Sequence, residues 1–279
     1  MRAVSSFVCL LAACLALAAP ALADVGPPLQ PPGSSIAPGG GTRVQMVAER
    51  VVLEVLPPPE AGLVRVRAVF TMRNPGDDEE RMAVRFPLED LSGMGDGYRP
   101  FPRLVGFVAA ADGWPVATRV VEEPGQVDGG EPVSWAVFDV AFPPGEDVEI
   151  DVTYETQLTG YHDPEMTGYD PAIAHYILET GAGWDGPIGS ADLILRLPYE
   201  AGPENVFLED GTTLGAGFAG HEVRWHWENL EPTRQDEWRA RIVWPDDWLR
   251  ILALRRAVQT QPGDATTWID LAEAYRGAG

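Results

Sequence analysis

The sequence predicts a mainly β protein: an antiparallel β-sandwich, either one large or two in tandem, followed by a short C-terminal α-helical hairpin. Three observations predict this fold class. Apolar and polar residues alternate with a period of two in many short runs between residues 43 and 245, which is typical of half-buried strands. Clusters of Gly, Pro, Asn and Asp separate these runs at hairpin length. Apolar residues at helical spacing begin only after Asp246 and Asp247, so βαβ units are not expected.

Residues 1–23 have the anatomy of a secretory signal peptide. Arg2 supplies the positive charge, an apolar run covers residues 7–19, and Ala21-Leu22-Ala23 is a suitable cleavage site. An alternative is a lipoprotein signal, because Leu11-Ala12-Ala13-Cys14 resembles a lipobox. Residues 24–42 follow as a linker rich in Pro and Gly. Either signal predicts an extracytoplasmic location, in the periplasm, in the cell envelope or secreted.

Charge and cysteine content narrow the classes of function. The chain has 42 acidic residues against 20 basic ones, giving a formal net charge of −22. Such a surface repels phosphate backbones and anionic lipids, so we expect no nucleic-acid partner. Both cysteines, Cys9 and Cys14, lie in the signal segment, so a chain cut after Ala23 has no disulfide or thiolate. After the signal, no segment is apolar over enough residues to span a bilayer.

The first part of the β region is expected to form strands joined by short turns. These strands cover residues 51–56, 64–72, 81–88, 103–110, 115–122, 134–142 and 148–154. The second is the clearest, because apolar residues occupy every second position from Val64 to Met72. The run Asn74-Pro75-Gly76-Asp77-Asp78 predicts a turn, and Asp112-Gly113 predicts a β-hairpin.

The stretch from Ala174 to Tyr199 is predicted to form a strand, a Gly-rich corner and a second strand. Four glycines between residues 181 and 189 allow positive φ and close backbone approach. No Lys, Ser or Thr closes a phosphate-binding motif, and a strand follows instead of a helix. Trp184 is the one aromatic side chain of the corner, where it either caps the core or serves as a ligand platform. Strands at 205–208, 223–227 and 238–244 complete the β region, and 159–171 is the best boundary if there are two sandwiches.

Residues 246–279 are expected to form the helical hairpin. Asp246 or Asp247 suits the N-cap of the first helix. Apolar residues then recur at helical spacing until Pro262-Gly263 ends the helix, and a second short helix starts near Ala265.

The sequence offers no recognised catalytic constellation. The motif G-x-S-x-G is absent, and the four histidines lack the spacing of zinc ligands. Asp163, Glu165 and Asp170 are a weak calcium candidate, because oxygen ligands suit that ion, but their spacing is not that of an EF-hand and a solvated loop is the simpler explanation. We therefore expect a protein that is not an enzyme and has no cofactor and no catalytic residue.

Aromatic residues give an alternative function. Trp184, Trp225 and Trp227 are candidates for an exposed platform that stacks on sugars, as in a carbohydrate-binding module or a glycan-acting enzyme. Burial of at least two of the three in the core is the simpler expectation.

The tail carries the most specific pattern. Trp268-x2-Leu271-Ala272-x2-Tyr275 resembles the first helix of a tetratricopeptide repeat, and Leu254, Ala257 and Pro262 lie where that repeat places packing residues and its closing proline. The pattern departs at Arg250, where a small residue is usual. The resemblance implies a helical surface that binds protein partners, through Leu254, Trp268, Leu271 and Tyr275.

The β region resembles a group of exported bacterial domains with no known reaction. The residues that carry the resemblance are Tyr176-x-Leu178-x-Thr180-Gly181-x-x-Trp184-x-Gly186-Pro187-Ile188, with Val66 to Asn74 and Phe86-Pro87. This resemblance implies a fold and a compartment only. Taken together, the sequence favours a non-catalytic exported module that binds a partner protein, or a second copy of itself, through β-domain loops and the helical tail.

Overall fold

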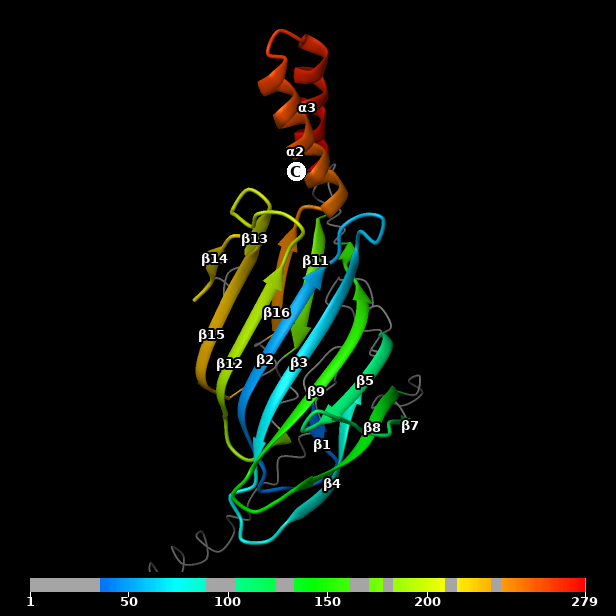
Figure 1. Ribbon diagram of the computed structural model, residues 1–279, viewed down its shortest axis with the longest axis vertical. Coiled ribbons are helices and arrows are strands. Elements are labelled where there is room, and N and C mark those ends of the chain that lie inside the picture. Colours follow the sequence, from blue (N-terminus) through cyan, green and yellow to red (C-terminus); the bar gives the residue numbers. More distant parts are fainter. Residues whose placement is uncertain are drawn as a thin grey trace, which may run out of the picture.

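The computed structural model describes residues 36–88, 104–123, 133–160, 171–177, 183–208, 215–231 and 237–278. In these residues the protein is mainly β, as the sequence predicts. A large eight-stranded sheet forms one layer, two four-stranded sheets lie behind it, and a helical hairpin stands at one end (Figure 1).

The eight-stranded sheet has the order β14-β15-β12-β2-β3-β9-β5-β6. Its strands are β2 (Gln45–Val55), β3 (Leu63–Arg73), β5 (Val105–Ala111), β6 (Trp114–Pro115), β9 (Asp147–Gln157), β12 (Ile188–Arg196), β14 (Gly217–Ala219) and β15 (Glu222–Leu230). Neighbouring strands pair antiparallel except β12 with β2, which are parallel. The sheet is therefore mostly antiparallel, as predicted, and its one parallel pair joins two strands far apart in the sequence.

The second layer consists of two small sheets. One has the order β1-β4-β8-β7, and the other has the order β10-β11-β16-β13. Their strands are β1 (Ala37–Pro38), β4 (Glu80–Pro87), β7 (Arg119–Glu123), β8 (Val133–Phe142), β10 (Thr159–Gly160), β11 (Ala172–Ile177), β13 (Val206–Leu208) and β16 (Glu237–Ile242). In Figure 1, β11 and β16 lie behind the half of the large sheet nearer the helices, and β4 and β8 lie toward the far end.

Aromatic side chains join the two layers. The ring centroids of Phe86 on β4 and Tyr154 on β9 lie 5.4 Å apart. Those of Trp225 on β15 and Trp238 on β16 lie 4.8 Å apart in an edge-to-face arrangement. Strands from both sides of residues 159–171 share the large sheet and contribute to one buried core. The two halves of the β region thus form one sandwich.

Several local predictions are confirmed. β3 alternates along its whole length between buried apolar residues and residues that are exposed or half-buried. The predicted hairpin joins β5 to β6, with φ of 49° at Asp112 and 77° at Gly113, as a type I′ turn requires. The strand predicted at 115–122 is wrong in its extent, because residues 116–118 separate β6 from β7 and the two strands belong to different sheets.

The tail consists of α2 (Pro245–Thr260) and α3 (Ala265–Gly277). The predicted capping by Asp246 or Asp247 is wrong, because Trp244 is the N-cap residue of α2 and makes no side-chain cap. Both carboxylates lie in the first turn, where they still favour the positive end of the helix dipole. α3 is capped by Asp264, whose side chain accepts a hydrogen bond from the Thr266 backbone N–H at 3.1 Å.

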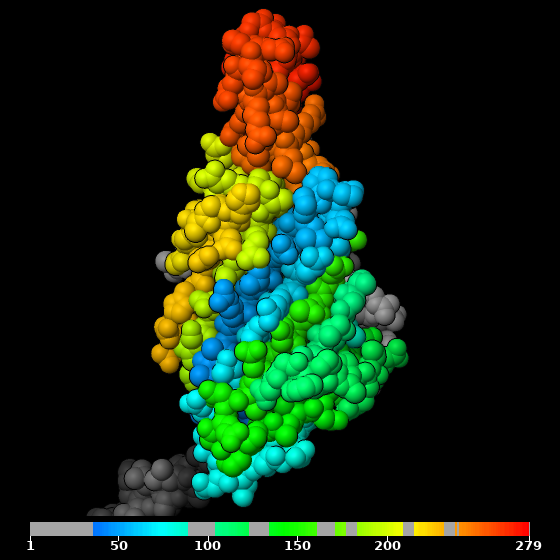
Figure 2. All heavy atoms as spheres, in the orientation of Figure 1, coloured from blue at the N-terminus to red at the C-terminus, as the bar shows by residue number. Residues whose placement is uncertain are grey.

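The helical pair projects beyond the end of the sandwich, and the space-filling view shows it as a narrow extension (Figure 2). Figure 1 places the C-terminal end of α3 beside the base of α2, so α3 runs back toward the sandwich. None of the helices in the described part of the chain has the length and apolar character needed to cross a membrane.

Candidate functional site

The base of the tail is fixed to the sandwich through α2. Trp248 and Ile251 are buried, and the Trp248 ring centroid lies 6.3 Å from that of Tyr199. The Tyr199 hydroxyl in turn donates a hydrogen bond to the carbonyl of Val243, two residues before α2, at 3.0 Å. Burial of these aromatic rings gives the tail a firm attachment, because large aromatic side chains contribute most to such contacts.

Arg255 connects three parts of the molecule. From α2, its guanidinium forms an ion pair with Glu204 of the β domain at 2.6 Å and donates to the Tyr275 hydroxyl on α3. The guanidinium carbon also lies 5.0 Å from the ring centroid of Trp248 and 5.3 Å from that of Tyr275. These cation–π and charge-assisted contacts fix the position of α3 relative to the sandwich.

The surface of α3 carries an exposed apolar strip, defined here as Trp268, Ala272 and Tyr275. At 3.6 residues per turn these residues fall within about 60° of the helix circumference. The side chain of Trp268 is 50% exposed and that of Tyr275 is 38% exposed. Both are held in place, since the Trp268 indole N–H donates to the Pro262 carbonyl at 3.0 Å and Arg255 binds the Tyr275 hydroxyl. The strip is therefore an ordered surface.

Of the four tail residues predicted to bind a partner, Trp268 and Tyr275 are exposed, whereas Leu271 and Leu254 are covered to different degrees. Leu271 is only 7% exposed, and Leu254 is half-buried against the core. Leu271 shares its direction with Ala274, which is also buried, so this side of α3 faces α2. Sequence analysis missed Ile269, which is 58% exposed beside the strip. The sequence signal that could have identified Ile269 is its large apolar side chain directly after Trp268.

The Gly-rich corner is structural. Trp184 is 4% exposed, its indole N–H donates to the Ile36 carbonyl at 2.9 Å, and its ring packs edge-on against Phe142. A side chain at Gly189 would place its Cβ 2.5 Å from the Val47 carbonyl oxygen, so this position needs glycine for close backbone approach. Residues 183–189 lead into β12 and pack against the chain around the start of β2, where the Asp185 backbone N–H donates to the Val44 carbonyl at 3.0 Å. Trp184 therefore lies in the core, where the core-cap interpretation places it, and its ring is not exposed as a ligand platform would be.

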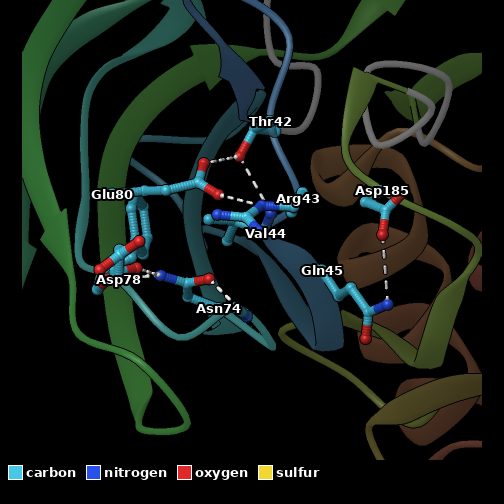
Figure 3. Close-up of polar contacts among 10 residues, drawn as sticks. Thr42, Arg43, Val44, Gln45, Asn74, Asp78, Glu80 and Asp185 are labelled. Carbon is cyan, nitrogen blue, oxygen red and sulfur yellow. Dashed lines mark hydrogen bonds and ion pairs between the residues drawn. The ribbon is translucent and has the colours of Figure 1, made fainter.

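Polar contacts hold residues 42–45, at the start of β2, against neighbouring parts of the sandwich (Figure 3). Glu80 accepts hydrogen bonds from the Thr42 hydroxyl at 2.7 Å and from Arg43 at 3.3 Å. On the corner side, the Gln45 amide donates to Asp185 at 3.4 Å. The Thr42 and Arg43 contacts lower the pKa of Glu80, the hydroxyl contributing most. These contacts connect the start of β2 with the start of β4 and with the Gly-rich corner, so their role is structural.

Asn74 organises the adjacent turn, also drawn in Figure 3. It is fully buried, and its side-chain amide donates to the carbonyls of Asp78 at 2.8 Å and Phe142 at 2.9 Å. Its side-chain oxygen accepts the N–H of Gly76 at 2.9 Å, which closes an Asx-turn. The predicted turn at 74–78 is thereby confirmed.

Trp225 and Trp227, the other two tryptophans of the predicted sugar-stacking platform, do not form an exposed aromatic surface. Trp225 is 1% exposed and lies in the core against Trp238. Trp227 is half-buried against the same core. The physical reason is strand periodicity: Trp225 and Trp227 alternate with Arg224 and His226 and therefore share the inward side of β15. Trp184 and Trp225 therefore lie in the core, as the simpler expectation had it, and do not present an exposed face for sugar stacking.

The outer face of the large sheet is strongly charged. Arg67 donates three hydrogen bonds of 2.6–3.1 Å to the carboxylate of Asp151, and Arg73 donates one to each carboxylate oxygen of Asp147, at 2.6 and 2.7 Å. On β15, His226 bridges two carboxylates: Nδ1 lies 2.8 Å from Asp192 and Nε2 lies 2.8 Å from Glu228. The hydrogen bond to Asp192, followed by that to Glu228, raises the pKa of His226. Sequence analysis missed this group, because Asp192 and His226 become neighbours only through strand register.

In the described residues, no three His, Cys, Asp or Glu side chains come together in an arrangement that suits a metal ion. The calcium candidate formed by Asp163, Glu165 and Asp170 lies outside the described residues, as do the signal segment and most of the 159–171 loop.

Comparison with known proteins identifies likenesses of fold. No protein-family model and no curated protein matches the chain. Among solved structures, the chain is similar to a Legionella pneumophila protein provisionally described as nutrient binding, with 19% identity and a TM-score of 0.57 over 81% of this chain and 74% of that one. This likeness shows a shared fold.

Weaker likenesses extend to parts of larger enzymes. Yeast LTA4 hydrolase gives a TM-score of 0.43 at 9% identity, over 71% of this chain and 28% of that one. An M1 zinc metallopeptidase from Deinococcus radiodurans gives 0.36 at 12% identity, over 72% of this chain and 42% of that one. The chain spans less than half the length of these enzymes, and similarity this low carries no argument about activity.

Proposed function

We propose that the chain is a non-catalytic, exported protein-interaction module that binds a partner protein through its helical tail, with β-domain loops as a further contact. The observation that carries the proposal is the exposed strip of Trp268, Ala272 and Tyr275 on a projecting helix. Ordered aromatic groups on a protruding element are typical of binding surfaces, because they bury much apolar area at little cost in conformational entropy.

The geometry of the strip favours a helical partner segment. Its three residues follow the i, i+4, i+7 spacing that a partner helix packs against, and the small Ala272 between two rings permits close approach. Fixed side chains also lower the cost of binding, since Arg255 and the Pro262 carbonyl already hold Tyr275 and Trp268 in place.

No second function is proposed. The carbohydrate alternative depended on a platform of three tryptophans, and two of these lie in the core.

Site-specific photocrosslinking tests the proposal. A photoreactive residue replaces Ala272 in the full chain, expressed in the organism that encodes it, and adducts are identified by mass spectrometry. We expect a defined protein adduct that disappears when Trp268→Ala and Tyr275→Ala are added. A photoreactive residue at Phe218 on β14, an exposed aromatic position on the sandwich, serves as the control and should not give that adduct. Absence of any adduct from position 272 would overturn the proposed function.

Export is tested separately by the mass of the mature protein. We expect Asp24 at its N-terminus, whereas a lipid-modified Cys14 would favour the lipoprotein alternative.

A further inference from the structure

The side chains of the exposed strip are spaced so that two copies of the strip can pack against each other in antiparallel orientation. Trp268 and Tyr275 lie at equal distances, about 5 Å along the axis, on either side of a point between Leu271 and Ala272. Ala272 is exposed close to that midpoint. If two α3 helices pack antiparallel about a twofold axis there, Trp268 of each copy meets Tyr275 of the other. The two Ala272 residues then face each other and let the helices approach closely.

The distribution of charge favours the same arrangement. The tail, residues 245–277, holds five carboxylates and four arginines, so nearly all of the formal net charge of −22 lies outside it. Two sandwiches of this charge repel each other at close range, which disfavours association through their faces. The uncharged strip lies on the near-neutral element that projects away from the sandwich.

Antiparallel packing also keeps the two sandwiches apart. Because α3 runs back toward its own sandwich, an antiparallel α3 pair places the two sandwiches at opposite ends of a four-helix assembly. The 13 residues of α3 span about 20 Å. This exceeds the screening length of about 8 Å at physiological ionic strength, so repulsion between the sandwiches is weak in this geometry.

We propose that the protein bound by the strip is a second copy of this chain, packed tail to tail through antiparallel α3 helices. This inference rests on the proposed function, because it names the partner for the same surface. The assembly is a twofold dimer in which each strip covers the other and the acidic sandwiches point outward.

A charge-swap experiment tests the proposed dimer. Sedimentation velocity of the full chain lacking residues 1–23 is recorded over a concentration series for the wild type, Ala272→Asp and Ala272→Arg, and for an equimolar mixture of the two variants. We expect a concentration-dependent dimer for the wild type. Each variant alone should dimerise at least about tenfold more weakly, because like charges meet at the twofold axis. The mixture should form a heterodimer.

Phe218→Asp on β14 provides the matched control, since it places a charge at an exposed apolar site on the sandwich, and it should dimerise like the wild type. Near-ultraviolet circular dichroism verifies that every variant is folded. A wild type that stays monomeric at all concentrations, or an Ala272→Asp variant that dimerises as well as the wild type, would overturn the dimer. If the wild type is monomeric but position 272 crosslinks to a different protein in cells, the inference fails and the proposed function stands. A monomer without any adduct would overturn both.

Discussion

The hydroxyl of Tyr176 on β11 donates a hydrogen bond of 2.8 Å to the carboxylate of Glu49 on β2, across the two layers of the sandwich. Both residues are buried. Glu49 lies on the same side of β2 as the apolar positions Val51 and Leu53, so an ionisable group occupies a core-facing position. Burying a carboxylate is costly unless donors compensate, and the tyrosine hydroxyl is one such donor.

Removing this donor should destabilise the fold. We expect Tyr176→Phe to lower the free energy of unfolding by about 1–3 kcal/mol, because the buried carboxylate of Glu49 loses a hydrogen bond that water cannot replace. Urea unfolding measures the change. Tyr275→Phe is the control, since its hydroxyl is near the surface and should cost less. Equal stability of Tyr176→Phe and the wild type would show that this contact does not stabilise the core.

The His226 bridge predicts a pH dependence with a definite sign. Its carboxylate partners raise the pKa of His226 in the folded state above the unfolded value of about 6.5. The protonated bridge therefore stabilises the fold fully below about pH 6.5, and this contribution is lost as the pH rises through the folded pKa. The effect is modest, because the imidazole is exposed to solvent.

Two measurements check this sign. An NMR titration should give His226 a higher pKa than it has in an Asp192→Asn, Glu228→Gln double variant. The difference in urea midpoint between wild type and His226→Gln should be larger at about pH 5.5 than at about pH 8.5. A midpoint difference that grows with rising pH would contradict the prediction.

Arg255 should determine how firmly the tail is held. We expect Arg255→Ala to lower the local stability of α3 by about 1–2 kcal/mol, because it removes two cation–π contacts and the ion pair with Glu204. Hydrogen exchange of the α3 amides reports the change. Arg256→Ala is the matched control, as its side chain is exposed on the same helix. Unaltered α3 exchange in Arg255→Ala would mean that apolar packing alone holds the tail.

The close approach of Gly189 to the β2 backbone leads to a separate prediction. Gly189→Ala should cost about 1–3 kcal/mol, because its Cβ would lie 2.5 Å from a backbone oxygen of β2, which has little freedom to move. Gly202→Ala is the control, since nothing lies within 4 Å of its Cβ, and should change stability by less than about 0.5 kcal/mol. The urea midpoint should fall for Gly189→Ala alone, and similar midpoints for both variants would refute the steric argument.

Features set by neighbouring residues were predictable from the sequence. The alternation along β3, the Asp112-Gly113 hairpin and the end of α2 before Pro262 all depend on local backbone preferences. These preferences act over a few residues, so composition and spacing suffice to predict them.

Long-range relationships were not predictable. The parallel pairing of β12 with β2 joins residues more than a hundred positions apart. The spacing of Trp268, Leu271 and Tyr275 predicted a helix with an apolar surface. Only the position of α2 decides that Leu271 is buried and Trp268 is exposed. Arg255 likewise acquires its role from contacts with Glu204 and Tyr275, which no local pattern encodes.

Hydroxyl-radical footprinting of Trp268 tests the central claim most directly, which is that the strip on α3 is covered by protein in the cell. Oxidation of Trp268 is compared between intact cells and the dilute purified chain, with the highly exposed Trp114 on β6 as the internal reference. We predict that Trp268 is protected in cells relative to Trp114 and that Trp268 becomes reactive on dilution. Equal reactivity of Trp268 in both settings, normalised to Trp114, would contradict the claim that this surface binds a protein.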